Sequence, residues 1–334
     1  MANISTSYLG LSLKSPLVAS ASPLSKKLEN VVKLEDAGIG ALVVYSLFEE
    51  QIIHEQADRD HFLSRGSNAH PEAQAYFPDL GSYNLEPDRY LAHLSAIRKS
   101  VKIPVIGSLN GVTRGGWTEW ARRIEETGVN ALELNVYSIP TDPVVDGVSV
   151  ENQVVDLVAE VVGKVGIPVS VKLSPFYSSI PNLVARIGSA GAKGVVLFNR
   201  FLQPDLDPEN LSVMSAAKLS DSSDLSLPLR WTAILSGRVA PQIALSGGVA
   251  TGRDLLKALL AGAQVGQVAS AILSQGSDVV GRMLTELGEW MDEQEYESVD
   301  QLRGSMSQKK VADPAAFERA QYMRALTSLD DRFV

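Results

Sequence analysis

The sequence predicts an α/β fold, a (β/α)8 TIM barrel with an N-terminal hairpin and loop insertions. Buried apolar runs of strand length alternate with helical patterns eight times along the chain. The strand runs are continuously apolar, as expected for a parallel sheet that is covered on both faces. The eight units follow one another without an evident break, which favours a closed barrel over an open sheet and one domain over residues 1–334.

The chain begins with a predicted hairpin, 4–8 and 11–13, that turns at Leu9-Gly10 and precedes the barrel. Predicted barrel strands run over 16–20, 41–45, 103–107, 131–135, 169–174, 194–199, 242–248 and 264–270. Predicted helices run over 25–37, 87–100, 117–127, 150–165, 180–190, 229–240, 253–261, 278–291 and about 314–326. Glycines such as Gly38 and Gly128 stand where these helices should stop. The stretches 48–87 and 200–228 keep no apolar period and are predicted to be insertions.

Composition narrows the function classes. The net charge of −9 and the pI of about 5.1 give no basic surface for nucleic acid or for an anionic membrane. The absence of cysteine excludes disulfides, iron–sulfur clusters, thiolate zinc sites and a cysteine nucleophile on this chain. No apolar run approaches about 18 residues and the first residues lack a signal-peptide pattern, so we expect a soluble cytoplasmic protein.

Polar residues interrupt or end several of the apolar strand runs. Asn135 ends the fourth strand, Lys172 lies in the fifth and Asn199 ends the sixth. In a barrel the carboxyl ends of the strands meet at one face, where catalytic residues are placed. A buried lysine needs a carboxylate or a ligand as its partner. These side chains together predict a polar ring that a planar ligand rich in hydrogen-bonding groups could fill.

Taken singly, these residues allow other interpretations. Lys172 could be a Schiff-base lysine, a flavin contact or part of a structural ion pair. Asn135 and Asn199 are equally typical of loop capping, and Ser138 stands where a serine is most often a turn former. Three of the four histidines fall in the first insertion without metal-ligand spacing, so we expect solvated residues and no metal site: His54, His61 and His70.

A glycine-rich turn follows the seventh predicted strand. In Ser246-Gly247-Gly248 the glycines allow backbone N–H groups to approach a phosphate closely, and the next helix would add its positive N-terminus. Ala269 and Ser270 end the eighth strand, and barrels often bind phosphate after strands seven and eight. We therefore predict a phosphate site here, and the alternative is a tight turn without a ligand.

Taken in chain order, these strand ends resemble the dihydroorotate dehydrogenases, especially the soluble class. The resemblance covers essentially the whole chain and rests on six segments: Ser20-Ala-Ser22, Glu133-Leu-Asn135, Val171-Lys-Leu173, Asn199, Ser246-Gly-Gly248 and Ala269-Ser270. That family consists of FMN-containing barrels that oxidise dihydroorotate to orotate in pyrimidine biosynthesis. The resemblance thus implies an FMN-dependent dehydrogenase that acts on a CH–CH group by hydride transfer to the flavin.

The resemblance also implies roles for individual residues. Lys172 would face the N1/O2 edge of the flavin and stabilise charge in the reduced ring, as both a catalytic and a cofactor-binding residue. Asn135 and Asn199 would lie between flavin and substrate. Ser138 falls where the family places its catalytic base, and a serine needs a relay to take a proton from substrate carbon. The other cofactor contacts would be Ser20, Ala21, Ser22, Ser246, Gly247, Gly248, Ala269 and Ser270.

The sequence departs from the family pattern on the substrate side. The family loop Asn-Leu-Ser-Cys-Pro-Asn reads Asn-Val-Tyr-Ser-Ile-Pro here, so Pro140 replaces a substrate-binding asparagine. Tyr45 stands in place of a lysine, an asparagine of the first insertion falls near Pro78, and Arg200 could supply a new anion contact. The flavin side is kept, and much of the orotate side is replaced. The candidate substrate contacts are Tyr45, Asn135, Asn199 and Arg200.

Three functions stay open on the sequence. The first is an FMN oxidoreductase, acting on dihydroorotate or on another small cyclic or conjugated substrate. The second is a non-redox barrel lyase that uses Lys172, and the third is a flavin- or phosphate-binding protein without catalysis. A flavin spectrum would separate the first and third from the second. We expect a small-molecule substrate as partner, no nucleic acid and no membrane, and the family suggests a homodimer.

Overall fold

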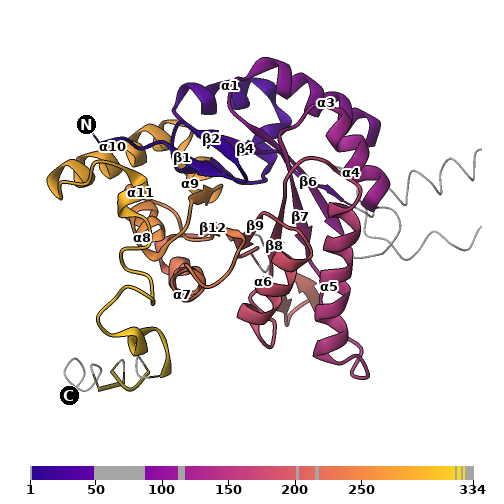
Figure 1. Ribbon diagram of the computed structural model, residues 1–334. Coiled ribbons are helices and arrows are strands. Elements are labelled where there is room, and N and C mark those ends of the chain that lie inside the picture. Colours follow the sequence, from indigo (N-terminus) through magenta and orange to yellow (C-terminus); the bar gives the residue numbers. More distant parts are fainter. Residues whose placement is uncertain are drawn as a thin grey trace, which may run out of the picture.

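A ring of eight parallel strands forms the centre of the protein in the computed structural model, and helices surround it (Figure 1). The structure describes residues 2–48, 87–111, 117–200, 203–214, 218–319, 322–324 and 326–327. In ring order the strands are β3 (Leu17–Ala19), β4 (Ala41–Val43), β6 (Val105–Gly111), β7 (Ala131–Val136), β8 (Val169–Leu173), β9 (Gly194–Leu197), β12 (Gln242–Ser246) and β13 (Val265–Val268). Each strand pairs with the next, and β13 pairs with β3. The predicted (β/α)8 barrel is therefore confirmed.

Amphipathic helices follow the strands and cover the outside of the barrel. They are α1 (Leu28–Asp36), α3 (Pro87–Ser100), α4 (Trp117–Glu126), α5 (Gly147–Val162), α6 (Ile180–Ser189), α7 (Ser226–Leu235), α8 (Gly252–Ala261), α9 (Ser270–Gln275) and α10 (Asp278–Glu293). In α4 the buried residues Trp117, Trp120, Ala121 and Ile124 recur at the spacing of one helix face. Such faces pack on the strands and form one large apolar core between the two layers.

A second, smaller core fills the N-terminal half of the barrel interior. The predicted hairpin is present as β1 (Thr6–Tyr8) and β2 (Leu11–Leu13). It carries Tyr8, Leu9 and Leu13 into a cluster with inward-facing residues of the barrel strands. Apolar side chains thus close this end of the barrel, and the polar residues of the interior are left for the C-terminal ends of the strands.

Some element boundaries differ from the prediction, and two of them have a clear physical cause. Helix α7 ends five residues before position 240, because Gly237 adopts a φ of +70° that an α-helix cannot continue. Helix α5 begins at Gly147 rather than at 150, because the carboxylate of Asp146 accepts the N–H of Ser149 at 2.6 Å and caps it. Strand β6 also runs on to Gly111, well past the predicted end at 107.

Several short elements were not predicted. The insertion after β9 contains an exposed antiparallel hairpin, β10 (Asp205–Asp207) and β11 (Ser212–Met214), and then the 3-10 turn η2 (Ser222–Leu225). The other additions are η1 (Pro23–Lys26), β5 (Leu47–Phe48), α9, α11 (Val299–Leu302) and η3 (Pro314–Phe317), the last in place of the start of the predicted final helix. Most of the predicted first insertion lies outside the described residues. None of the described helices is long and apolar enough to span a membrane.

Candidate active site

Polar side chains replace the apolar core toward the C-terminal ends of the barrel strands. Sheet register pairs Asn110 of β6 with Asn135 of β7, and Asn135 with Lys172 of β8. Residues in register on neighbouring parallel strands point to the same face of the sheet, so these three form a row. All three are buried, with exposed fractions of 9%, 9% and 6%. The structure therefore sets Asn135 beside Lys172 and adds Asn110, which the sequence analysis did not single out.

Four buried side chains form a closed ring across the barrel interior, which we call the buried ring. The ammonium of Lys172 donates to Ser20 Oγ at 3.1 Å, and the hydroxyl of Ser20 donates to Oε1 of Gln267 at 3.1 Å. The Nε2 group of Gln267 donates to Oε2 of Glu133 at 2.7 Å. The other carboxylate oxygen of Glu133 lies 3.8 Å from Lys172 Nζ and closes the ring.

Chemistry dictates the direction of every hydrogen bond in the buried ring. A carboxylate only accepts, so Gln267 must turn its NH2 group toward Glu133 and its oxygen toward Ser20. The proton of Ser20 is then committed to Gln267, and its oxygen accepts from Lys172. Of the three donors on the ammonium, one bonds Ser20 and one faces Glu133. A third donor therefore remains for a ligand.

The floor beneath the buried ring is neutral. Tyr8 is fully buried in the small interior core. Burial raises the pKa of its phenol, and the negative charge of Glu133 raises that pKa further. Tyr8 therefore adds no charge of its own to the barrel interior.

Three polar atoms at strand ends are buried without a hydrogen-bond partner among the described residues. They are Oδ1 of Asn135, Oη of Tyr45 and Nη1 of Arg200. Buried polar atoms of native proteins are normally bonded, to protein, to water or to a ligand, because leaving them unpaired is costly. These atoms offer one acceptor and two donors, which suits a polar ligand at this end of the barrel.

The phenol of Tyr45 lies in an aromatic setting just past β4. Its backbone N–H donates to Ser25 Oγ at 2.8 Å, and its ring centroid lies 5.1 Å from Tyr90, 5.8 Å from His93 and 5.6 Å from the ammonium of Lys26. Burial raises the pKa of Tyr45 to about 12. Its hydroxyl is therefore a protonated donor at neutral pH.

The two glycines after β12 have different surroundings. Both have left-handed backbones, with φ of +93° at Gly247 and +83° at Gly248, a conformation that favours glycine. A Cβ on Gly247 would meet nothing within 4 Å, whereas a Cβ on Gly248 would lie 2.3 Å from the backbone nitrogen of Leu225. No acceptor among the described residues takes the N–H groups of Gly247, Gly248 or Ala269. These N–H groups are available to an anion.

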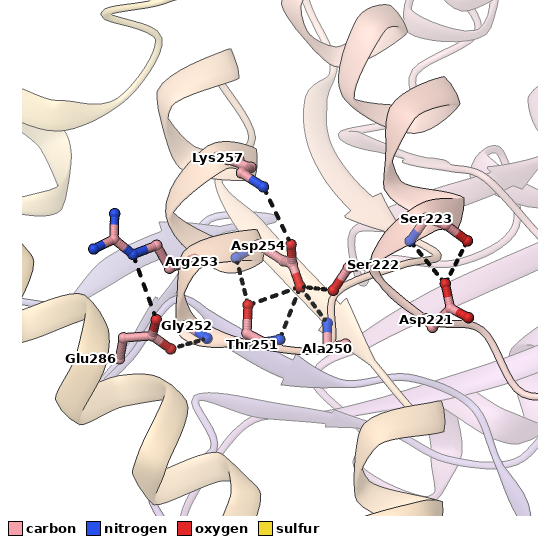
Figure 2. A network of polar contacts seen from close by, with 10 residues as sticks. All are labelled: Asp221, Ser222, Ser223, Ala250, Thr251, Gly252, Arg253, Asp254, Lys257 and Glu286. Atoms are coloured by element: carbon pink, nitrogen blue, oxygen red, sulfur yellow. Dashed lines mark hydrogen bonds and ion pairs between the residues drawn. The ribbon is translucent and has the colours of Figure 1, made fainter. Parts of the chain in front are cut away.

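Carboxylates already occupy the start of α8 (Figure 2). Asp254 Oδ2 accepts two loop N–H groups at 3.2 and 3.0 Å and the hydroxyls of Thr251 and Ser222 at 2.9 and 2.6 Å. Glu286 accepts the N–H of Gly252 at 2.7 Å. At this helix end, which the sequence suggested as part of a phosphate site, the N–H groups of Ala250, Thr251 and Gly252 are therefore already bonded to carboxylates.

Ser270 is tied to the insertion that follows β9. Its Oγ accepts from the N–H of Ser220 at 3.0 Å and from the hydroxyl of Ser220 at 2.9 Å. In the next residue, Asp221, hydrogen bonds from Ser223 hold the pKa of the carboxyl below its usual value, and Lys218 and Arg200 lower it further. The insertion thus brings both charge signs close to the end of β13.

The remaining predicted residues differ in how far they are enclosed. Ser138 and Pro140 lie on an exposed loop after β7, and no hydrogen bond joins Ser138 to the other candidates in the described part of the chain. Asn199 is half-buried, and its N–H donates to the carbonyl of Leu173 at 2.7 Å. At the end of β3, Ser22 is buried and Ala21 half-buried, and Ser246 ends β12 as a buried residue.

Three residues of the site were missed as functional candidates. Glu133 was noted only as part of a motif, although a carboxylate in an apolar strand signals a buried partner. Gln267 interrupts the apolar run of β13 in the same way. Asn110 was missed because β6 was predicted to end at 107, and so the residue at its true polar end was assigned to a loop.

The described residues contain no group of three or more His, Asp or Glu side chains that could hold a metal ion. The histidines of the first insertion, His54, His61 and His70, lie outside the described residues, as does Pro78. The chemistry that the described site offers is therefore that of an ammonium, amides, hydroxyls and free backbone N–H groups around a polar barrel end.

A closed (β/α)8 barrel with a buried lysine and unpaired donors at its C-terminal end defines a barrel enzyme. The family model for dihydroorotate dehydrogenase matches residues 3–291, so the chain belongs to the dihydroorotate dehydrogenase family. It is 25% identical to the catalytic subunit of dihydroorotate dehydrogenase B (NAD(+)) from Thermoplasma acidophilum, over 91% of this chain and 99% of the relative.

Two further relatives show the range of the family match. The corresponding catalytic subunit from Halalkalibacterium halodurans is 30% identical over 65% of this chain and 71% of its own length. The chloroplastic dihydropyrimidine dehydrogenase (NADP(+)) of Arabidopsis thaliana is 22% identical over 90% of this chain and 76% of its own length. By family, the chain is an oxidoreductase that acts on a CH–CH group, in a family that depends on flavin.

Proposed function

We propose that this protein is an FMN-dependent oxidoreductase that oxidises dihydroorotate to orotate with transfer of hydride to the flavin. The observation that carries the proposal is the position of Lys172, whose ammonium is held by Ser20 and Glu133 at the polar end of the barrel. A positive charge beside the electron-accepting ring is one of the ways in which proteins tune a flavin. Membership of the family supplies the reaction class.

The residues present fit the phosphate end of FMN. The free N–H groups of Gly247, Gly248 and Ala269 would hold the phosphate, because backbone N–H groups in a glycine turn make an anion-binding concavity. The hydroxyl of Ser270 would contribute beside them. Asp254 would not contact the phosphate. It would instead stabilise the conformation of the loop by accepting two of its backbone N–H groups.

The residues at the opposite side fit the ring of FMN, which when bound would accept the hydride. The small segment 20–22 leaves room for a flat ring, and the third donor of Lys172 would face its N1/O2 edge. The unpaired Oδ1 of Asn135 would accept an N–H group of the ring or of the substrate. Asn199 would approach from the far side, where it follows β9.

The substrate would meet residues that differ from the family pattern. The buried and unpaired Tyr45 Oη and Arg200 Nη1 would donate to its carbonyl and carboxylate oxygens. Ser138 would take the proton from substrate carbon as hydride leaves. Because Ser138 is exposed and a free hydroxyl is a weak base, it needs a neighbouring acceptor and the exclusion of water when substrate is bound.

The alternative is that the substrate is not dihydroorotate but another small molecule, and two residues on the substrate side favour it. Pro140 cannot donate a hydrogen bond where the family has asparagine, and Tyr45 cannot supply the charge of a lysine. A site that loses partners for a buried polar ligand rejects that ligand strongly. The same barrel would then reduce its flavin with another small cyclic compound that carries a saturated CH–CH bond next to a carbonyl. A Schiff-base lyase is less well supported, because the chain belongs to a family of oxidoreductases.

We expect the purified protein to be yellow and to release non-covalent FMN on heating, as identified by mass spectrometry. In anaerobic stopped-flow experiments, dihydroorotate should then bleach the flavin in a saturable phase. Slow bleaching by dihydroorotate combined with rapid bleaching by a different dihydropyrimidine would favour the second substrate. A colourless protein that cannot be reconstituted with FMN would refute both forms of the proposal.

Replacing Ser138 with alanine should slow flavin reduction by roughly 10²-fold, which is the typical cost of losing a positioned base. FMN should stay bound, because Ser138 follows β7 and lies in a loop apart from the glycine turn. The control is Ser189→Ala, which removes an exposed serine from the end of α6. An unchanged reduction rate in Ser138→Ala, with FMN bound, would show that another group takes the proton.

A further inference from the structure

The buried ring pairs two opposite charges without a direct hydrogen bond between them. Glu133 has an exposed fraction of 0%, and its Oε1 lies 3.8 Å from Lys172 Nζ. Its short contact, at 2.7 Å, is instead with the neutral amide of Gln267. The carboxylate is therefore close to the ammonium but not in direct hydrogen-bond contact with it. The amide of Gln267 keeps it there, because the same side chain is anchored at its other end by Ser20.

This arrangement has an electrostatic consequence for anything bound above Lys172. Inside a protein, charges interact more strongly than in water, so the negative charge of Glu133 offsets part of the positive potential of the ammonium. The N–H dipole of Gln267 in turn offsets part of the charge of Glu133. Tyr8 beneath the ring is neutral and adds nothing to this balance. Glu133 and Gln267 thus modulate the potential that Lys172 presents at this end of the barrel, and of these three residues only Lys172 would touch a ligand.

We propose that Glu133, held by Gln267, is a positioning residue that sets how strongly Lys172 favours the reduced over the oxidised cofactor. This inference rests on the proposed function, since it concerns the flavin that Lys172 would contact. Added electrons make the ring a better partner for a positive charge, so a stronger positive potential favours the reduced form. The negative charge of Glu133 weakens that potential, so the reduced cofactor is stabilised less strongly. The hydrogen bond from Gln267 offsets part of the charge of Glu133 and so limits this weakening.

The test is the ratio of the affinities for reduced and oxidised FMN, obtained from the midpoint potential of the bound flavin in an anaerobic dye-coupled titration. Glu133→Gln keeps the shape of the side chain and removes its charge, so the ratio should rise about tenfold, or about 30 mV for a two-electron couple. Gln267→Met leaves the charge and removes its hydrogen bond, so the ratio should fall several-fold. The two variants are thus expected to shift the potential in opposite directions.

The control is Glu125→Gln. Its carboxylate is likewise hydrogen-bonded, but to the backbone N–H groups of Gly166 and Ile167 at 2.8 and 3.1 Å, and it lies near the end of α4 on the outside of the barrel. The potential of this variant should match that of the parent. If the buried ring served only the fold, Glu133→Gln and Gln267→Met would lower the affinities for oxidised and reduced FMN by the same factor. The ratio of the two affinities would then stay unchanged.

Each outcome of the titration decides the inference. Opposite shifts in the two ring variants, with the control unchanged, support it. Suppose that the parent protein binds FMN but the affinity ratio is unchanged in the two ring variants, or shifts in the same direction in both. That result overturns the role of Glu133 and leaves the proposed function standing. If Glu133→Gln does not fold, a fall in the ratio for Gln267→Met is still required. Parent protein that takes up no FMN overturns both.

Discussion

Replacing Ser270 with aspartate should weaken the binding of FMN by roughly 10³-fold. The aspartate would place a carboxylate beside the free N–H groups of Gly247, Gly248 and Ala269, where the proposed phosphate lies. Two unit charges about 4 Å apart repel each other by about 4 kcal/mol at an effective dielectric constant of about 20. That energy corresponds to about three powers of ten in affinity. Equilibrium dialysis of the heat-stripped protein against FMN would measure the loss.

The fold of the Ser270→Asp variant should survive the change. The new carboxylate can accept the N–H and hydroxyl groups of Ser220, as the serine oxygen does now. Gly248→Asp is a poorer test, because a side chain there would strike the backbone of Leu225 and disturb the packing of η2. Ser298→Asp is the control, since it also places aspartate at a helix start, the N-cap of α11. Full FMN affinity in Ser270→Asp would move the phosphate site elsewhere.

The barrel could be predicted because its signal is repeated and local. Each βα unit carries its own apolar strand run, and glycines such as Gly38 and Gly128 mark the ends of several helices, so eight weak predictions support one another. The boundaries were missed where a single residue decides them, as at Gly237, which ends α7, and Asp146, which caps α5. The hairpin of β10 and β11 is exposed on both strands and so has no apolar alternation that a sequence pattern could show.

The site was predictable in part for a related reason. Lys172 and Asn135 stand out because each is a polar residue at the end of an apolar run. The buried ring was not visible, because it joins residues of β13 and the end of β3 to residues of β7 and β8 on the opposite side of the barrel. Even the neighbouring partners Ser20 and Gln267 are 247 positions apart in the sequence. The carboxylates at the start of α8 were missed because a helix start looks the same in the sequence whether its N–H groups are free or bonded to Asp254 and Glu286.

Replacing Lys172 with methionine should slow the reduction of the flavin by substrate by roughly 10²- to 10³-fold, the range seen when one preorganised donor to developing charge is removed. Methionine matches the length of the lysine stem and fills the same space without its charge. The single variant also leaves Glu133 as a buried carboxylate without a cation, and breaking a buried ion pair in this way typically costs about 3–5 kcal/mol of stability. The rate must therefore be separated from the loss of stability.

A second substitution makes that separation. Lys172→Met combined with Glu133→Gln removes both charges, and a glutamine at 133 can still accept from Gln267 as the carboxylate does. The double variant should regain most of the stability measured by urea denaturation, because no unpaired charge is left in the barrel. Its flavin reduction in stopped flow should stay slow, because the ammonium is still missing. Recovery of the rate together with the stability would show that Lys172 serves the fold of the barrel and not the chemistry.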